Sequence, residues 1–154
     1  MAIKSSVEKW ADGQGPLDAI YHGDDKVWPK PPLSAQGMSR SGSQSISGSF
    51  GGSANKLTGF TPQAGTSAAN VVDDGLVVNG EGSITVSATA SHNSTSSLRL
   101  DIYLNGVRVS TGTSATSQTW TGAVKEGDRL ELYVWSTTTI TRTNNSAALS
   151  YAVN

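Results

Sequence analysis

Three stretches of this sequence alternate strictly between apolar and polar residues, and that pattern constrains the fold more than any other feature. They span residues 83–90, 98–104 and 130–135. A period of two over six to eight residues is typical of a half-buried strand, with one face toward a core and one face away from it. No stretch shows sustained helical periodicity. We therefore expect an all-β protein, with these strands in an antiparallel β-sandwich.

Short turn motifs lie next to the alternating stretches. Asn105-Gly106 stands between Leu104 and Val107, and this dipeptide favours a two-residue type I′ hairpin. The sequence Lys125-Glu126-Gly127-Asp128 predicts a second turn that leads into the stretch beginning at residue 129. Residues 147–153 are expected to form the last strand.

The N-terminal region has a different character. Residues 19–22 and 26–28 flank Gly23-Asp24-Asp25, a pattern that predicts a short hairpin, and prolines at 29, 31 and 32 predict a stiff extended connector after it. A two-stranded hairpin alone is barely stable in water, so we expect it to dock on a partner. The anchoring side chains would be the apolar and aromatic ones: Trp10, Ile20, Tyr21, Val27 and Trp28.

These features divide the chain into three zones. Residues 1–32 would form an extended docking arm with the hairpin and the Pro-rich connector. Residues 33–42 are rich in Ser and Gly and are expected to be a flexible linker. Residues 43–154 would form the sandwich, beginning with an irregular first strand.

Composition argues against several classes of function. Charged residues make up 15% of the chain and the formal net charge is -1, so there is no basic surplus for binding nucleic acid. Cysteine is absent, which excludes disulfides and thiolate metal sites. No stretch is apolar enough to insert in a membrane, and the N-terminal residues lack the apolar core of a signal peptide. We expect a soluble protein made in the cytoplasm.

No catalytic or cofactor-binding motif is present. His22 and His92 are isolated from other metal-ligating residues, and the pairs Asp24-Asp25 and Asp73-Asp74 are better explained by turn formation. There is no nucleophile elbow and no phosphate-binding loop. We expect a non-enzymatic protein without a cofactor or a metal.

Aromatic residues on the predicted strands are the remaining candidates for function. Tyr133 and Trp135 share a strand face opposite to Leu132 and Val134. That face could belong to a second buried layer of the sandwich or to a subunit interface, and the pattern favours neither. The residues predicted to contact another subunit or a receptor are Tyr103, Trp120, Tyr133 and Trp135.

Residues 75–88, 100–106 and 124–132 resemble, in order, the central strands and turns of jelly-roll heads related to complement first component and tumour necrosis factor. The resemblance covers roughly residues 43–154, although position 84 is Ile where that family commonly has an aromatic residue. It implies a jelly-roll β-sandwich. It also implies a homotrimer, because such heads usually associate around a threefold axis.

Residues 19–29 resemble a short segment found near the termini of tailed-bacteriophage tail proteins, a group in which jelly-roll domains also occur. The resemblance implies a structural protein of the virion, assembled in the host cytoplasm. In the preferred hypothesis it is a minor tail or tail-tip protein that binds other virion proteins through its N-terminal arm. The alternatives are a capsid decoration or head-fibre protein, and a module that binds a carbohydrate or receptor at the host surface.

Overall fold

The computed structural model describes residues 20–22, 25–28, 32–49 and 51–154. The chain separates into two compact units, Met1–Pro32 and Leu33–Asn154. Each unit is described by itself below.

The first unit contains the predicted hairpin. Strand β1 (Ile20–His22) pairs antiparallel with β2 (Asp25–Trp28), with Tyr21 opposite Lys26. The hairpin prediction is therefore confirmed. Trp10 lies outside the described residues, and Ile20, Tyr21, Val27 and Trp28 are described through their backbone pairing alone.

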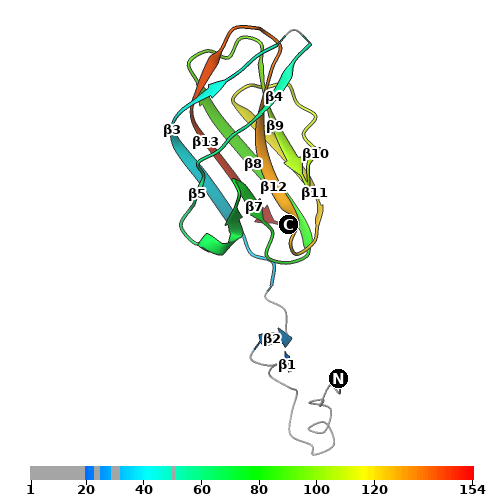
Figure 1. Ribbon diagram of the computed structural model, residues 1–154. Coiled ribbons are helices and arrows are strands. Elements are labelled where there is room, and N and C mark those ends of the chain that lie inside the picture. Colours follow the sequence, from blue (N-terminus) through cyan, green and yellow to red (C-terminus); the bar gives the residue numbers. More distant parts are fainter. Residues whose placement is uncertain (1–19, 23–24, 29–31, 50) are drawn as a thin grey trace, which may run out of the picture. The chain divides into compact units, whose positions relative to one another are not determined.

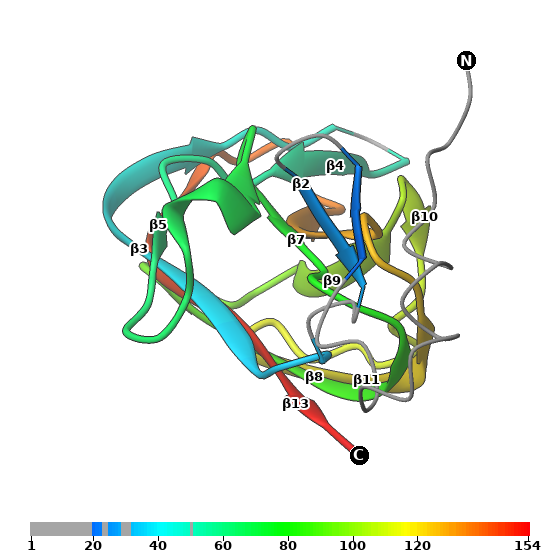
Figure 2. The ribbon, with the colours of Figure 1, turned by 90° about the horizontal axis from the view of Figure 1, so that it is seen from below.

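The second unit is a sandwich of two antiparallel sheets, as the alternating pattern predicted, and the two layers are visible in Figures 1 and 2. The first sheet has the order β11-β8-β13-β3-β5 and the second has the order β10-β9-β12-β7-β6, with β4 also paired to β12. The strands of the first sheet are β3 (Gln36–Ile46), β5 (Thr61–Pro62), β8 (Gly82–His92), β11 (Ser117–Val124) and β13 (Arg142–Val153). Those of the second are β4 (Ser53–Lys56), β6 (Val71–Val72), β7 (Gly75–Val77), β9 (Leu98–Leu104), β10 (Val107–Arg108) and β12 (Arg129–Ser136).

The order of the strands is that of a jelly roll. The chain crosses from one sheet to the other at each connection between β7 and β13 except the β9–β10 hairpin, which is how two Greek keys fold into two sheets. One strand position is shared, because β7 pairs with residues 129–131 of β12 and β4 pairs with residues 133–136 on the same side. The segment between them includes a short 3-10 turn, η2 (Ala68–Asn70).

The core consists of the apolar residues that the alternation placed on one face of each strand. Leu100, Ile102, Leu130, Leu132 and Leu149 are all fully buried. They lie on β9, β12 and β13, so both sheets contribute to one core. Burying such side chains is the main favourable term in the folding free energy.

The predicted turns are present. Asn105 and Gly106 have φ of 50° and 79° and join Leu104 to Val107 in a two-residue hairpin, as type I′ geometry requires. In the second turn the Asp128 amide donates to Lys125 O (3.0 Å), and the Asp128 carboxylate accepts from the Lys125 amide (2.8 Å).

The predicted linker over residues 33–42 is wrong for residues 36–42, which form the first part of β3. Gln36, Met38 and Arg40 alternate with smaller residues and are buried. Their backbone pairs with β13, with Met38 opposite Leu149. The Ser and Gly residues between them mark a strand face of small side chains rather than a flexible segment.

A buried polar cluster joins β3 to β13. Asn144 is fully buried at a β-bulge, and its Nδ2 donates to Ser91 O (3.0 Å) and Ser146 O (2.9 Å). Its Oδ1 accepts a hydrogen bond from Arg40 Nη1. Burial lowers the pKa of Arg40, an effect that the charge of Asp74 partly opposes.

We predict that Asn144→Ala lowers the free energy of unfolding by about 2–3 kcal/mol, because it leaves buried partners without a hydrogen bond. The exposed neighbour Asn145 provides the control, and Asn145→Ala should change stability by less than about 0.5 kcal/mol. Urea unfolding followed by circular dichroism measures both. Equal effects of the two substitutions would contradict a bridging role for Asn144.

Candidate functional site

The outward side of the second sheet gathers aromatic and charged side chains. Its outward positions are alternate residues of neighbouring strands: Glu131 lies opposite Tyr103, Tyr133 opposite Asp101, and Trp135 opposite Arg99. We call this surface the aromatic face, and it comprises Lys56, Arg99, Asp101, Tyr103, Arg108, Arg129, Glu131, Tyr133 and Trp135.

Strand alternation places these side chains on one surface. On β12, Leu130, Leu132 and Val134 are fully buried in the core, so the residues between them point away from it. Tyr103, Tyr133 and Trp135 are half-buried there. They lie on the outer surface of the sandwich and not within its core.

A buried carboxylate holds the centre of this face. Asp101 is 0% exposed and accepts hydrogen bonds from Arg99 through both of its oxygens (2.7 and 2.9 Å). Arg108 Nε donates to the same carboxylate (2.8 Å), and Arg108 Nη2 donates to Gly112 O (3.1 Å). These bonds tie β9 to β10 and to the loop that follows it.

The aromatic rings are held by close contacts. The rings of Tyr103 and Tyr133 have centroids 4.4 Å apart and are tilted by 40°. The Arg99 guanidinium carbon lies 5.4 Å from the Trp135 ring centroid, within the range of a cation–π contact. A Cβ at Gly52, where φ is 92°, would lie 2.2 Å from the indole of Trp135, so the backbone at residue 52 rests directly on that ring.

Burial and neighbouring charges raise the pKa values of two tyrosines and one arginine on the aromatic face. Burial raises the pKa of Tyr103 and of Tyr133, and the nearby charges of Asp101 and Glu131 add to the respective shifts. The hydrogen bond to Asp101 raises the pKa of Arg99. Tyr103 and Tyr133 therefore keep their protons, and Arg99 its charge, to a higher pH than the free side chains would.

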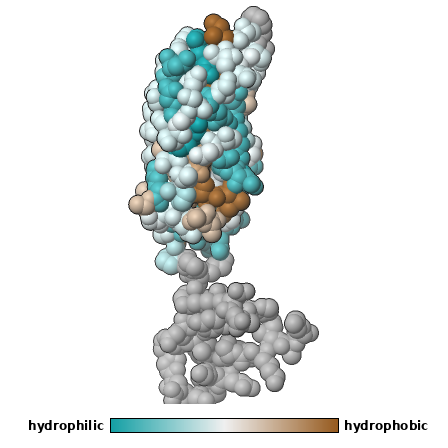
Figure 3. Space-filling model, turned by 60° about the vertical axis from the view of Figure 1, so that its left-hand side comes forward, coloured by the Kyte–Doolittle hydropathy of each residue, from teal (hydrophilic) through white to brown (hydrophobic). Residues whose placement is uncertain are grey.

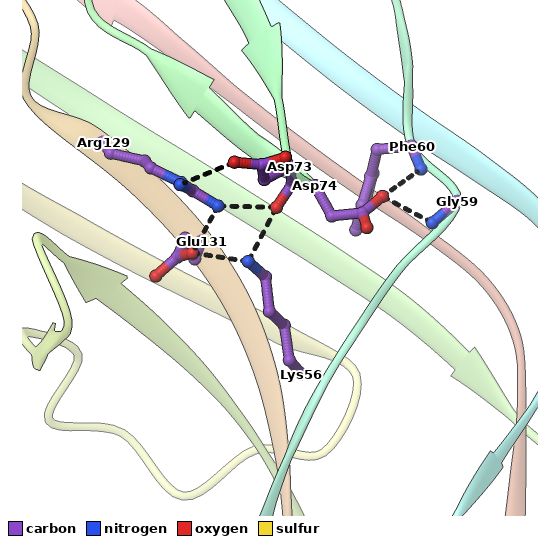
Figure 4. A network of polar contacts seen from close by, with 7 residues as sticks. All are labelled: Lys56, Gly59, Phe60, Asp73, Asp74, Arg129 and Glu131. Atoms are coloured by element: carbon purple, nitrogen blue, oxygen red, sulfur yellow. Dashed lines mark hydrogen bonds and ion pairs between the residues drawn. The ribbon is translucent and has the colours of Figure 1, made fainter.

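A second ionic network lies beside the first (Figure 4). Glu131 Oε1 accepts from Lys56 Nζ (2.6 Å) and forms an ion pair with Arg129 Nη2 (3.0 Å). Both cations also donate to the backbone oxygen of Asp73, at 2.7 and 2.6 Å. The network thereby joins β4, β12 and the turn between β6 and β7.

Asp73 and Asp74 form that turn, with φ of 47° and 60°, and they have different contacts (Figure 4). The Asp74 carboxylate accepts from the amides of Gly59 (2.6 Å) and Phe60 (3.1 Å). The Asp73 side chain is 81% exposed, with Arg129 Nη1 at 3.7 Å. The pair acts in turn formation, as the sequence predicted.

The outward side of the first sheet has a different surface, which we call the small-residue face. Residues 39, 41, 85, 87, 89, 91, 148 and 150 are all Ser, Thr or Ala. It carries two shallow depressions of about 350 and 370 Å³, the first lined in part by Gly37, Ser87 and Ser150 and the second by Ser39, Thr89 and Ala148. Figure 3, with the β3 and β5 side turned forward, shows mostly pale or hydrophilic surface and only small brown areas.

The structure separates the four aromatic residues predicted as contacts. Tyr103, Tyr133 and Trp135 lie together on the aromatic face. Trp120 lies on β11 in the other sheet, where it packs against the core and over Gly122.

The sequence interpretation missed the charged members of the aromatic face. Arg99 and Asp101 stand at the outward positions of an alternating strand, so their spacing could have suggested a pair on one surface. The complete burial of Asp101 had no sequence signal, because it depends on Arg108 and on the loop after β10.

The aromatic face can contact a partner through its aromatic rings, its tyrosine hydroxyls and its paired charges. Within residues 32–49 and 51–154 and the two described strands of the hairpin, no three His, Asp or Glu residues gather in a way that could hold a metal ion. His92 donates from Nε2 to Ala115 O (3.0 Å), and burial lowers its pKa. In the same described part of the chain, no helix has the length and apolar character to cross a membrane.

Comparison of the sequence with models of known protein families and with curated proteins found no match.

We predict that Asp74→Ala lowers the free energy of unfolding by about 2 kcal/mol, because two backbone amides lose a charged acceptor. Asp73→Ala is the matched control in the same turn, and it should have the smaller effect because the Asp73 side chain is mostly exposed. Thermal and urea unfolding of both variants tests this. A larger loss from Asp73→Ala would contradict the assignment.

We predict that Tyr103 and Tyr133 ionise above the ordinary tyrosine pKa of about 10. Because the folded-state pKa is raised, the unfolded chain loses these protons first, so stability is intact below about pH 10 and falls as the pH rises above it. Ultraviolet absorbance of tyrosinate measures the ionisation, and Tyr103→Phe with Tyr133→Phe should weaken the alkaline loss of stability. Ionisation of both residues near pH 10 would refute the burial argument.

Proposed function

We propose that this protein is a non-enzymatic structural component of a bacteriophage virion, a minor tail or tail-tip protein. Its N-terminal unit docks on other virion proteins and its jelly-roll sandwich is carried as a head. The observation that carries the proposal is the division of the chain at Pro32 and Leu33 into a hairpin unit and a sandwich with its own core. Such a division suits a protein that is held at one end and makes contacts with the other.

The state of the charged groups supports a contact role over a chemical one. Arg99 and Arg108 each form an ion pair with Asp101, and Lys56 forms one with Glu131. Ion pairs of this kind satisfy the charges of these side chains and hold them in place on the surface. The two depressions on the small-residue face are shallow and lined mostly by short side chains, which suits a broad contact better than a small ligand.

The resemblance of residues 19–29 to phage tail segments supports the location on a virion. The anchors in this proposal are Trp10, Ile20, Tyr21, Val27 and Trp28. A hairpin of three and four residues gains stability when a partner buries its side chains. Capsid decoration is the first alternative, and it differs only in the particle protein that receives the hairpin.

Recognition of a host-surface carbohydrate is a second candidate function, favoured by the aromatic face. Tyr103, Tyr133 and Trp135 are partly exposed and lie among hydrogen-bonding groups, so a sugar would contact the parts of the rings that their neighbours leave open. In this case the sandwich would bind the host while the N-terminal unit stays on the particle.

We predict that deletion of residues 1–32 leaves a folded sandwich that no longer joins particles. The test is complementation of a phage that lacks this gene, with purified particles analysed for the protein. In the full chain, Val27→Asp with Trp28→Ala should also abolish incorporation, whereas Lys26→Ala on the same strand should not.

Normal incorporation of the deletion variant would refute docking through the N-terminal unit. Labelled antibodies on the particles distinguish tail from capsid. Binding of host cell-wall sugars that is lost on Trp135→Ala, with incorporation unchanged, would add the receptor role.

A further inference from the structure

The edges of the two sheets differ in how they are covered. In the second sheet, the loop after β10 runs along β9, where Leu100 N donates to Ser114 O and Ile102 N donates to Ser110 Oγ. In the first sheet, β3 is covered on its outer side by residues 56–63, through β5 and through Gln44. Among the described residues 32–49 and 51–154, the remaining long edge strand is β11.

Strand β11 pairs with β8 along its whole length, and no described residue pairs with its other side. The Ala90 amide donates to Thr116 O (2.9 Å), and antiparallel pairs alternate between bonded and non-bonded positions. The even-numbered residues of β11 therefore bond to β8. The odd-numbered residues Thr119, Thr121 and Ala123 turn their backbone N–H and C=O groups to the open side, and all three are exposed.

This edge has none of the features that usually protect one. Natural edge strands carry lysines, prolines or bulges, or are very short. β11 has eight residues, no charged residue and no proline, and its register with β8 is unbroken. An open edge of this length is a template for another strand.

We propose that β11 pairs antiparallel with β11 of a second copy of this chain, joining the two first sheets into one continuous sheet. The strand is neutral, so self-pairing brings no like charges together. In the register centred on Trp120, Thr119 of one copy lies opposite Thr121 of the other, and each pair exchanges both backbone hydrogen bonds.

The side chains fit this register. Thr119 and Thr121 would meet their counterparts on the small-residue face, and cross-strand threonine pairs are favourable. Trp120 of each copy would lie beside its counterpart on the inward side, at a non-bonded position where side chains approach most closely. The small-residue faces of the two copies would then form one continuous surface.

The junction is isologous and therefore has twofold symmetry. It is an alternative to the threefold association implied by the jelly-roll resemblance, and the mass of the assembly distinguishes the two. It stands apart from the proposed docking of the N-terminal unit, because it uses only the sandwich. An edge-to-edge contact buries little area, so the dimer should be weak and dependent on concentration.

The test is sedimentation equilibrium of the full chain from about micromolar to about millimolar concentration, a range that covers weak contacts. We expect mass to rise from the 15.9 kDa of one chain to twice that value. Thr119→Lys with Thr121→Lys should raise the dimer Kd by about tenfold or more through like-charge repulsion. Thr121→Pro should weaken the dimer by removing an edge N–H. Ser87→Lys is the matched control, since Ser87 is exposed on the neighbouring strand opposite Thr119, and it should still dimerise.

The register has its own test, because the chain has no cysteine. Thr119→Cys with Thr121→Cys should give a covalent dimer on oxidation, whereas Thr119→Cys with Ala123→Cys should cross-link much more slowly. Circular dichroism confirms that each variant is folded. The proposal is overturned by a monomer at all concentrations, by a threefold mass, or by a dimer that the charged variant leaves intact.

Discussion

The structure of the sandwich depends on one constraint: each sheet must remove one of its faces from water, and only the other sheet can cover it. Strand alternation meets this constraint on β9, β12 and β13, whose inward residues are buried almost completely. Because aliphatic residues occupy most inward positions, most polar and aromatic residues of these strands lie at outward positions; Asn144 and Tyr151 on β13 are buried exceptions. The residues that do not face the core form the two outer faces of the sandwich.

The two outer faces differ in the length of their side chains and in how those side chains are held. On the aromatic face, long side chains must be kept in place, and buried Asp101 does this by binding two arginines at once. On the small-residue face there is almost nothing to keep in place, since Ser, Thr and Ala have little conformational freedom to lose. A partner on the aromatic face would contact long aromatic and charged side chains that are held in fixed positions. A partner on the small-residue face could approach the strand backbone closely. Both surfaces support the proposed contact role.

The fold was largely predictable from the sequence, because its main determinants are local. Alternation at residues 98–104 and 130–135 predicted two strands, and Asn105-Gly106 predicted the geometry of the turn that follows the first of them. The first part of strand β3 was not predicted. The Ser and Gly residues at 36–42 fit a flexible linker as well as a strand whose outward side chains are short. What distinguishes them is the pairing with β13, more than a hundred residues away in the sequence.

The candidate site was less predictable for the same reason. Tyr133 and Trp135 could be placed on one face from their spacing, and Tyr103 joins them only through the register between β9 and β12. Trp120 is also a tryptophan on an alternating strand, like Trp135. It does not lie on the aromatic face, because β11 belongs to the first sheet. Likewise, the role of Asp74 depends on amides that the loop at residues 59 and 60 brings to it.

The pairing of β3 with β13 has a mechanical consequence. β3 is the first strand of the sandwich, so any pull transmitted along the chain from residue 32 enters the sandwich there. It is registered with β13 from Gln36 opposite Tyr151 to Ile46 opposite Arg142. If the sandwich is held at the end where β3 reaches Ile46, a force applied at residue 32 acts along the axis of β3. The hydrogen bonds of the ladder then share the load in shear instead of breaking one after another, and the buried Asn144 cluster lies near the far end of that ladder.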